Sequence, residues 1–399
     1  YYRMIGKQVL EKLEFNKILE YISVYSYTVN GKEIILNKRP FDDVENALKY
    51  GNYVSEAKEI LIKNDFPPLS YIPDLTTSIA TAKIEDAVLN LQSIKDILSL
   101  AETSRKLYQF LKLNEEAQSI SNDFLNKLFV DKVFEHHISR IFDESGEISD
   151  NASPKLKEIR VEIKNKGDQL RKIVNRLLRQ LSESYLVQED YMTQRDGRLV
   201  LPIKSEHKRH VRGFIHSESS TGQTVYIEPE ETLELNNDIL SLSFAEKREI
   251  ERILKQVTKK IGEVSDQLKI SLRAISEIDA VFAAAKYSIE IIGSFPTFDI
   301  HKPFHLLEGR HPVLIKKIGL NKTVPLNLEI KNQNVILITG PNAGGKTVVL
   351  KTTGLLLIMA LSELYIPAHA DSNLHFSDKV LVDIGDQQSI EDTFIAYLH

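Results

Sequence analysis

The chain contains no cysteine among its 399 residues. This absence excludes disulfide bonds and zinc sites built from cysteine thiolates, two devices that often hold small domains together. A chain without cysteine is compatible with the reducing interior of a cell, so we expect a cytoplasmic location.

Long hydrophobic runs are missing as well. A membrane-spanning helix needs about 18 or more consecutive apolar residues with few or no charges, and no stretch of this sequence meets that condition. The longest apolar candidate, Thr352 to Leu361, is too short. No secretory signal is visible at the N-terminus. We therefore expect no membrane partner.

The chain also lacks a large excess of either charge. Its net charge is −5, with 42% hydrophobic and 27% charged residues, an ordinary composition for a soluble globular protein. This charge argues against a uniformly basic nucleic-acid binder, so any such site must be a local patch. The length is sufficient for two or three domains.

The first third of the chain has the apolar spacing of helices. Apolar side chains recur three and four positions apart, and no alternation typical of strands precedes residue 190. The predicted helices cover residues 8–30, 43–65, 88–113 and 121–142. We predict a helical core domain over residues 1–152, with no residue cluster that suggests chemistry.

Two long helical patterns follow the core domain. Ser153 and Pro154 have the order of an N-cap followed by proline at the first helical position. We predict an ascending lever helix over residues 153–190 and a descending lever helix over residues 233–295. A pattern of this length requires a partner helix, which the other lever helix supplies if the two run antiparallel.

A small β module, residues 191–232, lies between the two lever patterns, and we call it the clamp. Its turn residues divide three predicted strands, Arg198 to Lys204, Val211 to Ile215 and Thr224 to Glu228. Proline cannot donate to a ladder of hydrogen bonds, so Pro202 predicts an edge or a bulge in the first of these strands.

A P-loop pattern organises the last hundred residues. The apolar run from Val335 to Ile338 predicts a buried strand, and a helical pattern runs from Val348 to Leu364. Between them lies the motif G-x-x-x-x-G-K-[ST], in the strand-turn-helix context that a P-loop requires. We predict a nucleotide site at Gly340, Pro341, Asn342, Ala343, Gly344, Gly345, Lys346 and Thr347.

The residue types of this motif explain the predicted chemistry. The glycines let backbone N–H groups turn toward phosphate oxygens, and the following helix adds its positive N-terminal end. Lys346 is expected to reach the β- and γ-phosphates of ATP or ADP, and the Thr347 hydroxyl to ligate Mg²⁺. The alternative is a chance glycine-rich turn, which the flanking strand and helix patterns disfavour. We assign residues 296–399 to an incomplete P-loop ATPase domain, with a second strand at Val380 to Val382.

The clamp contains a cluster of positive residues. Only Asp196 and Glu206 oppose them, so the cluster is able to contact a phosphate backbone. The candidates are Arg195, Arg198, Lys204, Lys208, Arg209 and Arg212. The alternative is a solvated loop face, which describes most charge clusters. Three histidines nearby, His207, His210 and His216, do not have a spacing typical of a metal site.

Several segments together resemble bacterial MutS-family ATPases. They are similar to the type-two branch of this family, which lacks the mismatch-recognition and connector domains, and they cover nearly the whole chain. The segments are Leu13–Leu19, Ser153–Leu156, Arg195–Lys204, Ser220–Pro229, Glu234–Asn237, Gly309–Pro312, Ile338–Thr347 and Asp383–Ile390.

The resemblance implies a multidomain fold. It consists of an α-helical core and lever with an inserted small β clamp, followed by an α/β P-loop ATPase domain of the ABC type, truncated in this chain. In the family, ATP sites are completed across a homodimer. Members bind branched or distorted DNA and suppress homologous recombination, and some sense collided ribosomes, with rRNA as the partner, and split them. Full-length members carry a C-terminal Smr endonuclease domain.

The chain departs from the family pattern at its end. Ile384 stands where a Walker B motif has its catalytic glutamate, and residues 391–397 do not match the expected Ser-Thr-Phe signature. The Smr domain is absent. No catalytic residue is therefore assigned, and we expect a fragment that binds nucleotide weakly and hydrolyses ATP poorly.

Three functions remain open at this point. The first is the clamping of branched DNA with suppression of recombination, and the second is the sensing and splitting of collided ribosomes. Both use ATP to change the conformation of a clamp. The third is a non-catalytic nucleotide-binding scaffold.

The P-loop assignment makes a direct prediction for Lys346. Replacing Lys346 by Ala removes the charge expected to contact the terminal phosphates, so nucleotide-dependent effects should disappear while scaffolding is retained. Nucleotide affinity measured by titration calorimetry is the test. An unchanged affinity in the variant would overturn the site assignment.

Overall fold

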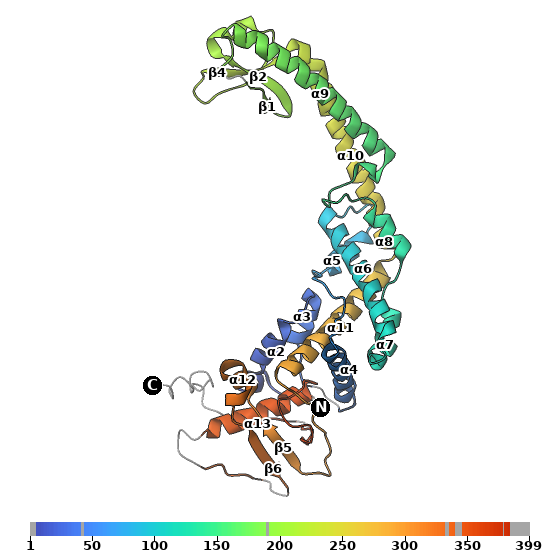
Figure 1. Cartoon of the computed structure of the whole chain (residues 1–399), viewed down its shortest axis with the longest axis vertical. Helices are drawn as coiled ribbons and strands as arrows, with labels where there is room; N and C mark the ends of the chain where they lie inside the picture. Colours follow the sequence, from blue (N-terminus) through green and yellow to red (C-terminus); the bar gives the residue numbers. More distant parts are fainter. Residues whose placement is uncertain are drawn as a thin grey trace. The chain divides into compact units, whose positions relative to one another are not determined.

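The computed structural model describes residues 5–40, 44–188, 191–331, 335–339, 345–377 and 379–383 (Figure 1). The chain divides into two compact units. Unit 1 comprises Tyr1–Ile79, Asp96–Asp131 and Val264–His399. Unit 2 comprises Ala80–Lys95 and Lys132–Glu263.

Unit 1 is built around helix α11 (Ser265–Glu290), which is buried over most of its length. Its apolar and small side chains lie on several faces of the helix, so neighbouring helices can cover it on more than one side. The helices α2 (Phe15–Ser23), α3 (Val29–Leu36) and α4 (Val44–Ile62) pack against it. The other elements are α1 (Lys7–Lys12), α7 (Gln118–Phe124), η1 (Leu125–Lys127), β5 (Phe304–Gly309), α12 (Pro312–Ile318), η5 (Leu320–Lys322), β6 (Leu326–Ile330) and α13 (Lys346–Leu361).

The predicted helices of the first third are confirmed in type. The described residues before residue 190 form helices and contain no strand of a sheet, although bounds differ from the prediction. The pattern over residues 121–142 is divided among α7, η1 and α8 (Lys132–Ser139). A long-range contact lies at this division: the Phe129 N–H donates to Ser271 Oγ of α11 at 3.2 Å. Among the described helices, none is both long enough and apolar enough to cross a membrane.

A buried carboxylate fixes the start of α3 on α11. Asp279 is only 1% exposed. Its Oδ2 accepts hydrogen bonds from Ser26 Oγ at 2.7 Å, Thr28 N at 2.8 Å and Thr28 Oγ1 at 2.7 Å. A buried charge must be satisfied by such donors. Gly31 follows one turn later because a Cβ there would lie 2.6 Å from the same carboxylate oxygen.

Unit 2 contains the two long helices that the sequence predicts. They are α9 (Pro154–Glu183) and α10 (Leu233–Glu263), which lie side by side in Figure 1. Ion pairs join Lys166 to Asp238 at 2.8 Å and Arg176 to Glu231. Residue numbers rise on one helix as they fall on the other, so the helices are antiparallel. Helices α5 (Thr76–Ala82) and α6 (Leu91–Leu113) pass from one unit to the other.

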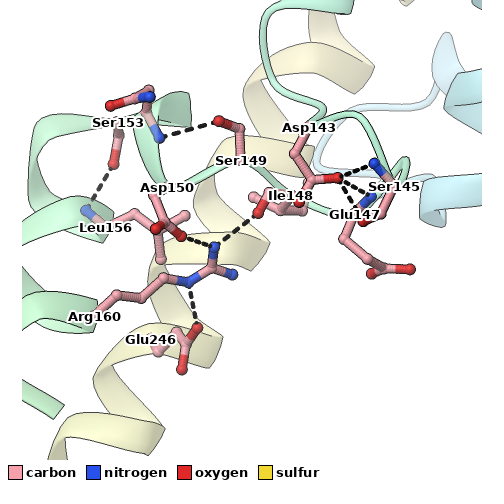
Figure 2. Close-up of polar contacts among 11 residues, drawn as sticks. Asp143, Ser145, Glu147, Ile148, Ser149, Asp150, Ser153, Leu156, Arg160 and Glu246 are labelled. Carbon is pink, nitrogen blue, oxygen red and sulfur yellow. Dashed lines mark hydrogen bonds and ion pairs between the residues drawn. The ribbon is translucent and has the colours of Figure 1, made fainter. Parts of the chain in front are cut away.

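The predicted cap at the start of α9 is confirmed. Ser153 Oγ accepts from Leu156 N at 3.0 Å, as an N-cap does (Figure 2). The same hydroxyl donates to Glu249 of α10 at 2.7 Å. The Arg252 side chain hydrogen-bonds Glu249, and with Ser153 and Lys155 it outweighs the effect of burial, so the pKa of Glu249 falls to about 2. The cap therefore also attaches one long helix to the other.

A second attachment lies two turns further along α9. Figure 2 shows Arg160 pointing toward the turn before the helix and toward α10. Its guanidinium donates to Ile148 O at 2.8 Å, Asp150 at 2.5 Å and Glu246 at 2.7 Å. Because the planar guanidinium has several donors, one side chain can join three segments.

The clamp is a four-stranded antiparallel sheet of order β1-β2-β4-β3. The strands are β1 (Thr193–Arg195), β2 (Arg198–Lys204), β3 (Gly213–Glu218) and β4 (Thr224–Pro229), with the 3-10 turns η3 (Ser205–His210) and η4 (Glu230–Thr232) nearby. A further 3-10 turn, η2 (Asp150–Ala152), directly precedes α9. β1 is a strand that the sequence reading missed. Pro202 lies in an inner strand, and its carbonyl accepts from Gln188 N at 2.9 Å. Its missing N–H faces that short flanking segment, so the ladder with β4 is preserved.

The descending pattern is not one continuous helix. It is interrupted at Val264, whose φ of −111° and ψ of 10° separate α10 from α11. Two residues earlier, Gly262 lies against the end of α5, where a Cβ would come within 2.3 Å of the Ala82 carbonyl oxygen. Close backbone contact therefore accompanies the end of α10, and the same interruption divides unit 2 from unit 1.

Two predicted strands near the P-loop are wrong. Residues 335–339 and 379–383 have no strand conformation, and Val335 and Leu337 are 84% and 85% exposed. A buried parallel strand requires neighbours on both sides, and among the described residues neither segment pairs with another strand. The described strands of this region are β5 and β6, which pair antiparallel with each other and which the sequence reading did not predict.

The double role of Ser153 predicts a measurable cost of its removal. Ser153→Ala eliminates the N-cap of α9 and the hydrogen bond to Glu249, so the free energy of unfolding should fall by about 1–2 kcal/mol. Ser184→Ala, at the exposed C-terminal end of α9, should change it by less than about 0.5 kcal/mol. Urea unfolding followed by circular dichroism measures both, and equal effects of the two variants would refute the capping role.

Candidate nucleotide and nucleic-acid sites

The described part of the predicted P-loop is the start of α13. Gly345 precedes the helix with φ of +80°, in the left-handed region that favours glycine. Lys346 and Thr347 form its first turn and are half-buried. The five other predicted residues, Gly340, Pro341, Asn342, Ala343 and Gly344, lie outside the described residues. A helix N-terminus with a threonine hydroxyl in its first turn is chemically suited to a phosphate with its metal ion.

A buried ion pair holds α13 against the N-terminal helices. Lys351 Nζ lies 3.5 Å from Glu14 Oε2, and both side chains are less than a tenth exposed. Glu14 Oε1 also accepts from Lys17 Nζ at 2.9 Å. Burial opposes ionisation of Glu14, but the Lys17 hydrogen bond and the charges of Lys351 and Lys17 outweigh it, so its pKa is lowered.

Close packing accompanies this ion pair. A Cβ at Gly354, one turn after Lys351, would lie 2.9 Å from the Leu13 side chain. Glu14 itself adopts a φ of +60°, which is uncommon for a residue with a side chain. The turn between α1 and α2 is therefore shaped to receive α13, and the position of the P-loop helix is tied to this turn.

His311 belongs to the same cluster. It is 1% exposed, and neither ring nitrogen has a hydrogen-bond partner among the described residues. Burial lowers its pKa to about 4, with the charges of Lys351 and Lys17 acting in the same direction and Glu14 opposing them. A neutral imidazole thus lies beside the ion pair.

The sequence reading missed the contact between these three residues. Glu14 and His311 lie in segments quoted for the family resemblance, but nothing in the sequence indicates that they meet. Lys351 does carry a signal, because it is the only charged residue between Val348 and Leu361. A lone charge within an apolar helix is seldom buried without a partner.

The six basic candidates of the clamp do not form one continuous site. Arg198 is held within the sheet, where its guanidinium donates to Glu228 at 2.7 Å and to Asn237 at 2.5 Å. Arg195 lies over the Tyr226 ring, 4.2 Å from its centroid. Both guanidinium groups therefore have partners within the clamp.

The other four candidates surround the turn η3. Lys208, Arg209 and Arg212 are exposed and Lys204 is half-buried. Within the described residues, none of the four forms an ion pair. We call Lys208, Arg209 and Arg212 the basic turn. They are the clamp cations that remain accessible to phosphate.

The three clamp histidines have different partners. The rings of His207 and His210 are 5.6 Å apart in an edge arrangement, whereas His216 Nε2 lies 2.5 Å from Glu228. Among the described residues, no group of three His, Cys, Asp or Glu side chains is arranged to hold a metal ion.

Comparison with known proteins gives close relatives. The chain is 37% identical over 395 residues to the endonuclease MutS2 of Clostridium perfringens strain SM101, covering 98% of this chain and 50% of that protein. It is 35% identical over 399 residues to the endonuclease MutS2 of Clostridium botulinum strain Eklund 17B, with the same coverage of 98% and 50%. The chain thus spans about half the length of the curated relatives that it matches. No protein-family model matches it.

His311 predicts a pH dependence of stability. Its pKa in the folded chain, about 4, lies below the ordinary value of 6.5, so between these values the unfolded chain binds a proton that the folded chain does not. The free energy of unfolding should fall as the pH drops from about 6.5 toward 4, by at most about 1.4 kcal/mol per pH unit.

Urea unfolding at several pH values tests this dependence. His311→Gln should reduce the slope in that window, because glutamine does not titrate. The matched variant His301→Gln, at an exposed position of the same unit, should leave the slope unchanged. A wild-type slope in His311→Gln would contradict the prediction.

Proposed function

The chain belongs to the type-two branch of the MutS family, and from this premise we propose that it acts as an ATP-driven clamp on nucleic acid. ATP with Mg²⁺ binds at Gly340 to Thr347, with Lys346 on the terminal phosphates and Thr347 on the metal ion. Two copies of the protein complete the ATP sites in a homodimer. The clamp holds branched DNA or the rRNA of a collided ribosome, in the cytoplasm.

The observation that carries this proposal is the basic turn. Lys208, Arg209 and Arg212 are exposed without an internal ion pair among the described residues. Their charges are therefore available to a phosphate backbone, which supplies most of the affinity in sequence-independent binding. Arg198, in contrast, is paired with Glu228 within the sheet.

The connection between Glu14 and Lys351 supports the ATP-driven part of the proposal. Lys351 lies on the helix that begins with Lys346, five residues earlier, and any shift of that helix on nucleotide exchange acts on α2. Such coupling requires that the ligand on the clamp binds with different affinity to the two nucleotide states of the protein.

A competition experiment decides between DNA and ribosomes as the ligand of the clamp. The complete protein, loaded with ATP, is offered four-way-junction DNA and collided ribosomes together at physiological salt. Preference for ribosomes, with subunits released on hydrolysis, supports translation rescue. Preference for the junction, with ribosomes left whole, supports control of recombination.

The basic turn predicts a change in salt dependence. Lys208→Gln and Arg209→Gln together remove two phosphate contacts, so the slope of log K against log salt should become shallower by about 1 to 2 for junction DNA. Lys259→Gln, at an exposed position of α10 without an ion pair, should retain the full slope. Fluorescence anisotropy over a salt series measures these values, and an unchanged slope in the double variant would remove the basis of the proposal.

A further inference from the structure

The pairing of the clamp strands gathers aromatic and cationic side chains on one face of the sheet. The register places Arg195 opposite Arg198, Pro202 opposite Tyr226, and Phe214 opposite Glu228. Residues opposite each other, and alternate residues of one strand, share a face. Arg195, Tyr226 and Phe214 therefore lie on the same face, which we call the stacking face.

Both faces of β2 and β4 are largely buried, and the opposite face carries the apolar core of the clamp. Leu201, Ile203, Val225 and Ile227 pack there against apolar residues of α9. On the stacking face, by contrast, Phe214 is 61% exposed although it lies in a strand. An exposed phenylalanine on a sheet is available to a ligand. Because single apolar residues are common on protein surfaces, Phe214 alone does not indicate which ligand binds.

The second observation is the arrangement of Arg195. The central carbon of its guanidinium lies 4.2 Å from the centroid of the Tyr226 ring, and within the described residues Arg195 forms no ion pair. An arginine on an aromatic ring presents a planar, positively charged surface. Phe214 and Tyr226 are diagonal neighbours on adjacent strands, so two planar surfaces lie near each other.

Local charge favours a nucleic-acid ligand over an acidic or apolar peptide. The carboxylate of this face, Glu228, is 1% exposed and is occupied by Arg198 and His216. The last residue of the basic turn, Arg212, lies two positions before Phe214 in the chain. A base has a planar face for stacking and a phosphate for the adjacent cations, and this combination matches how proteins bind single strands.

We propose that the stacking face binds unpaired nucleotides, with bases on Phe214 and on the Arg195–Tyr226 pair. This inference rests on the proposed function, because the basic turn contributes the phosphate contacts. It adds that the clamp distinguishes unpaired bases from continuous duplex. Branched DNA with single-stranded arms and rRNA loops both offer such bases.

The experiment compares Phe214→Ala with wild type on two ligands. Single strands of about ten thymidines or uridines present accessible bases, whereas a blunt duplex of the same length does not. Phe214→Ala should weaken single-strand binding by about 5- to 150-fold and leave duplex binding unchanged. Phe214→Tyr keeps an aromatic ring and should retain the affinity. Tighter binding of uridine strands would identify RNA as the source, and tighter binding of thymidine strands DNA.

A spectroscopic readout separates stacking from a structural role. The chain contains no tryptophan, so Phe214→Trp introduces a reporter whose emission should be quenched by a stacked base and not by inorganic phosphate. Absence of quenching at saturating single strand would overturn the inference.

The outcomes distinguish this inference from the proposed function. If Lys208→Gln with Arg209→Gln weakens both ligands but Phe214→Ala weakens neither, the stacking inference is wrong and the basic turn stands. If neither variant affects binding, both are wrong. If Phe214→Ala abolishes binding to a partner protein and leaves strand binding intact, the face is a protein-docking surface and the inference is refuted.

Discussion

The buried ion pair between Glu14 and Lys351 is the constraint on which unit 1 depends. A charge that has left water must be paired, because an unpaired partner costs several kcal/mol. This requirement connects two segments separated by 337 positions and places α13 on the turn before α2. The packing of Leu13 on Gly354 and the burial of His311 follow from the same close approach.

The same principle recurs wherever distant segments meet in this chain. Asp279 fixes the start of α3, Glu249 joins the two long helices, and Glu228 joins strands of the clamp. Each carboxylate is almost fully buried, and each is satisfied by donors from a different part of the chain. Apolar burial supplies the non-directional attraction, and these carboxylates specify which segments meet and in what register.

Local signals explain which features were predictable from the sequence. The helices α9 and α10 follow from apolar periodicity, and the start of α9 follows from Ser153 and Pro154. Non-local contacts explain what was missed. Glu14 and Lys351 form no pattern in one dimension, and the interruption at Val264 depends on where α5 ends. The apolar run at Val335 reads as a strand, yet a strand exists only where a second one supplies hydrogen bonds. For the clamp, counting charges identified the basic turn but could not separate it from Arg198, whose partner Glu228 is 30 positions away.

The division into two units has a consequence for how such proteins diversify. The chain crosses between the units four times, since unit 2 takes in Ala80–Lys95 as well as Lys132–Glu263. The run from Ser153 to Glu249, with α9, the clamp and the first part of α10, is nevertheless contiguous and antiparallel, and its two ends meet at the hydrogen bond between Ser153 and Glu249. Recombination of genes can therefore replace this run as one block, and the remaining segments keep their order along the chain. The segment Ala80–Lys95 of unit 2, in contrast, lies between two segments of unit 1 in the sequence, so it can be exchanged only together with unit 1.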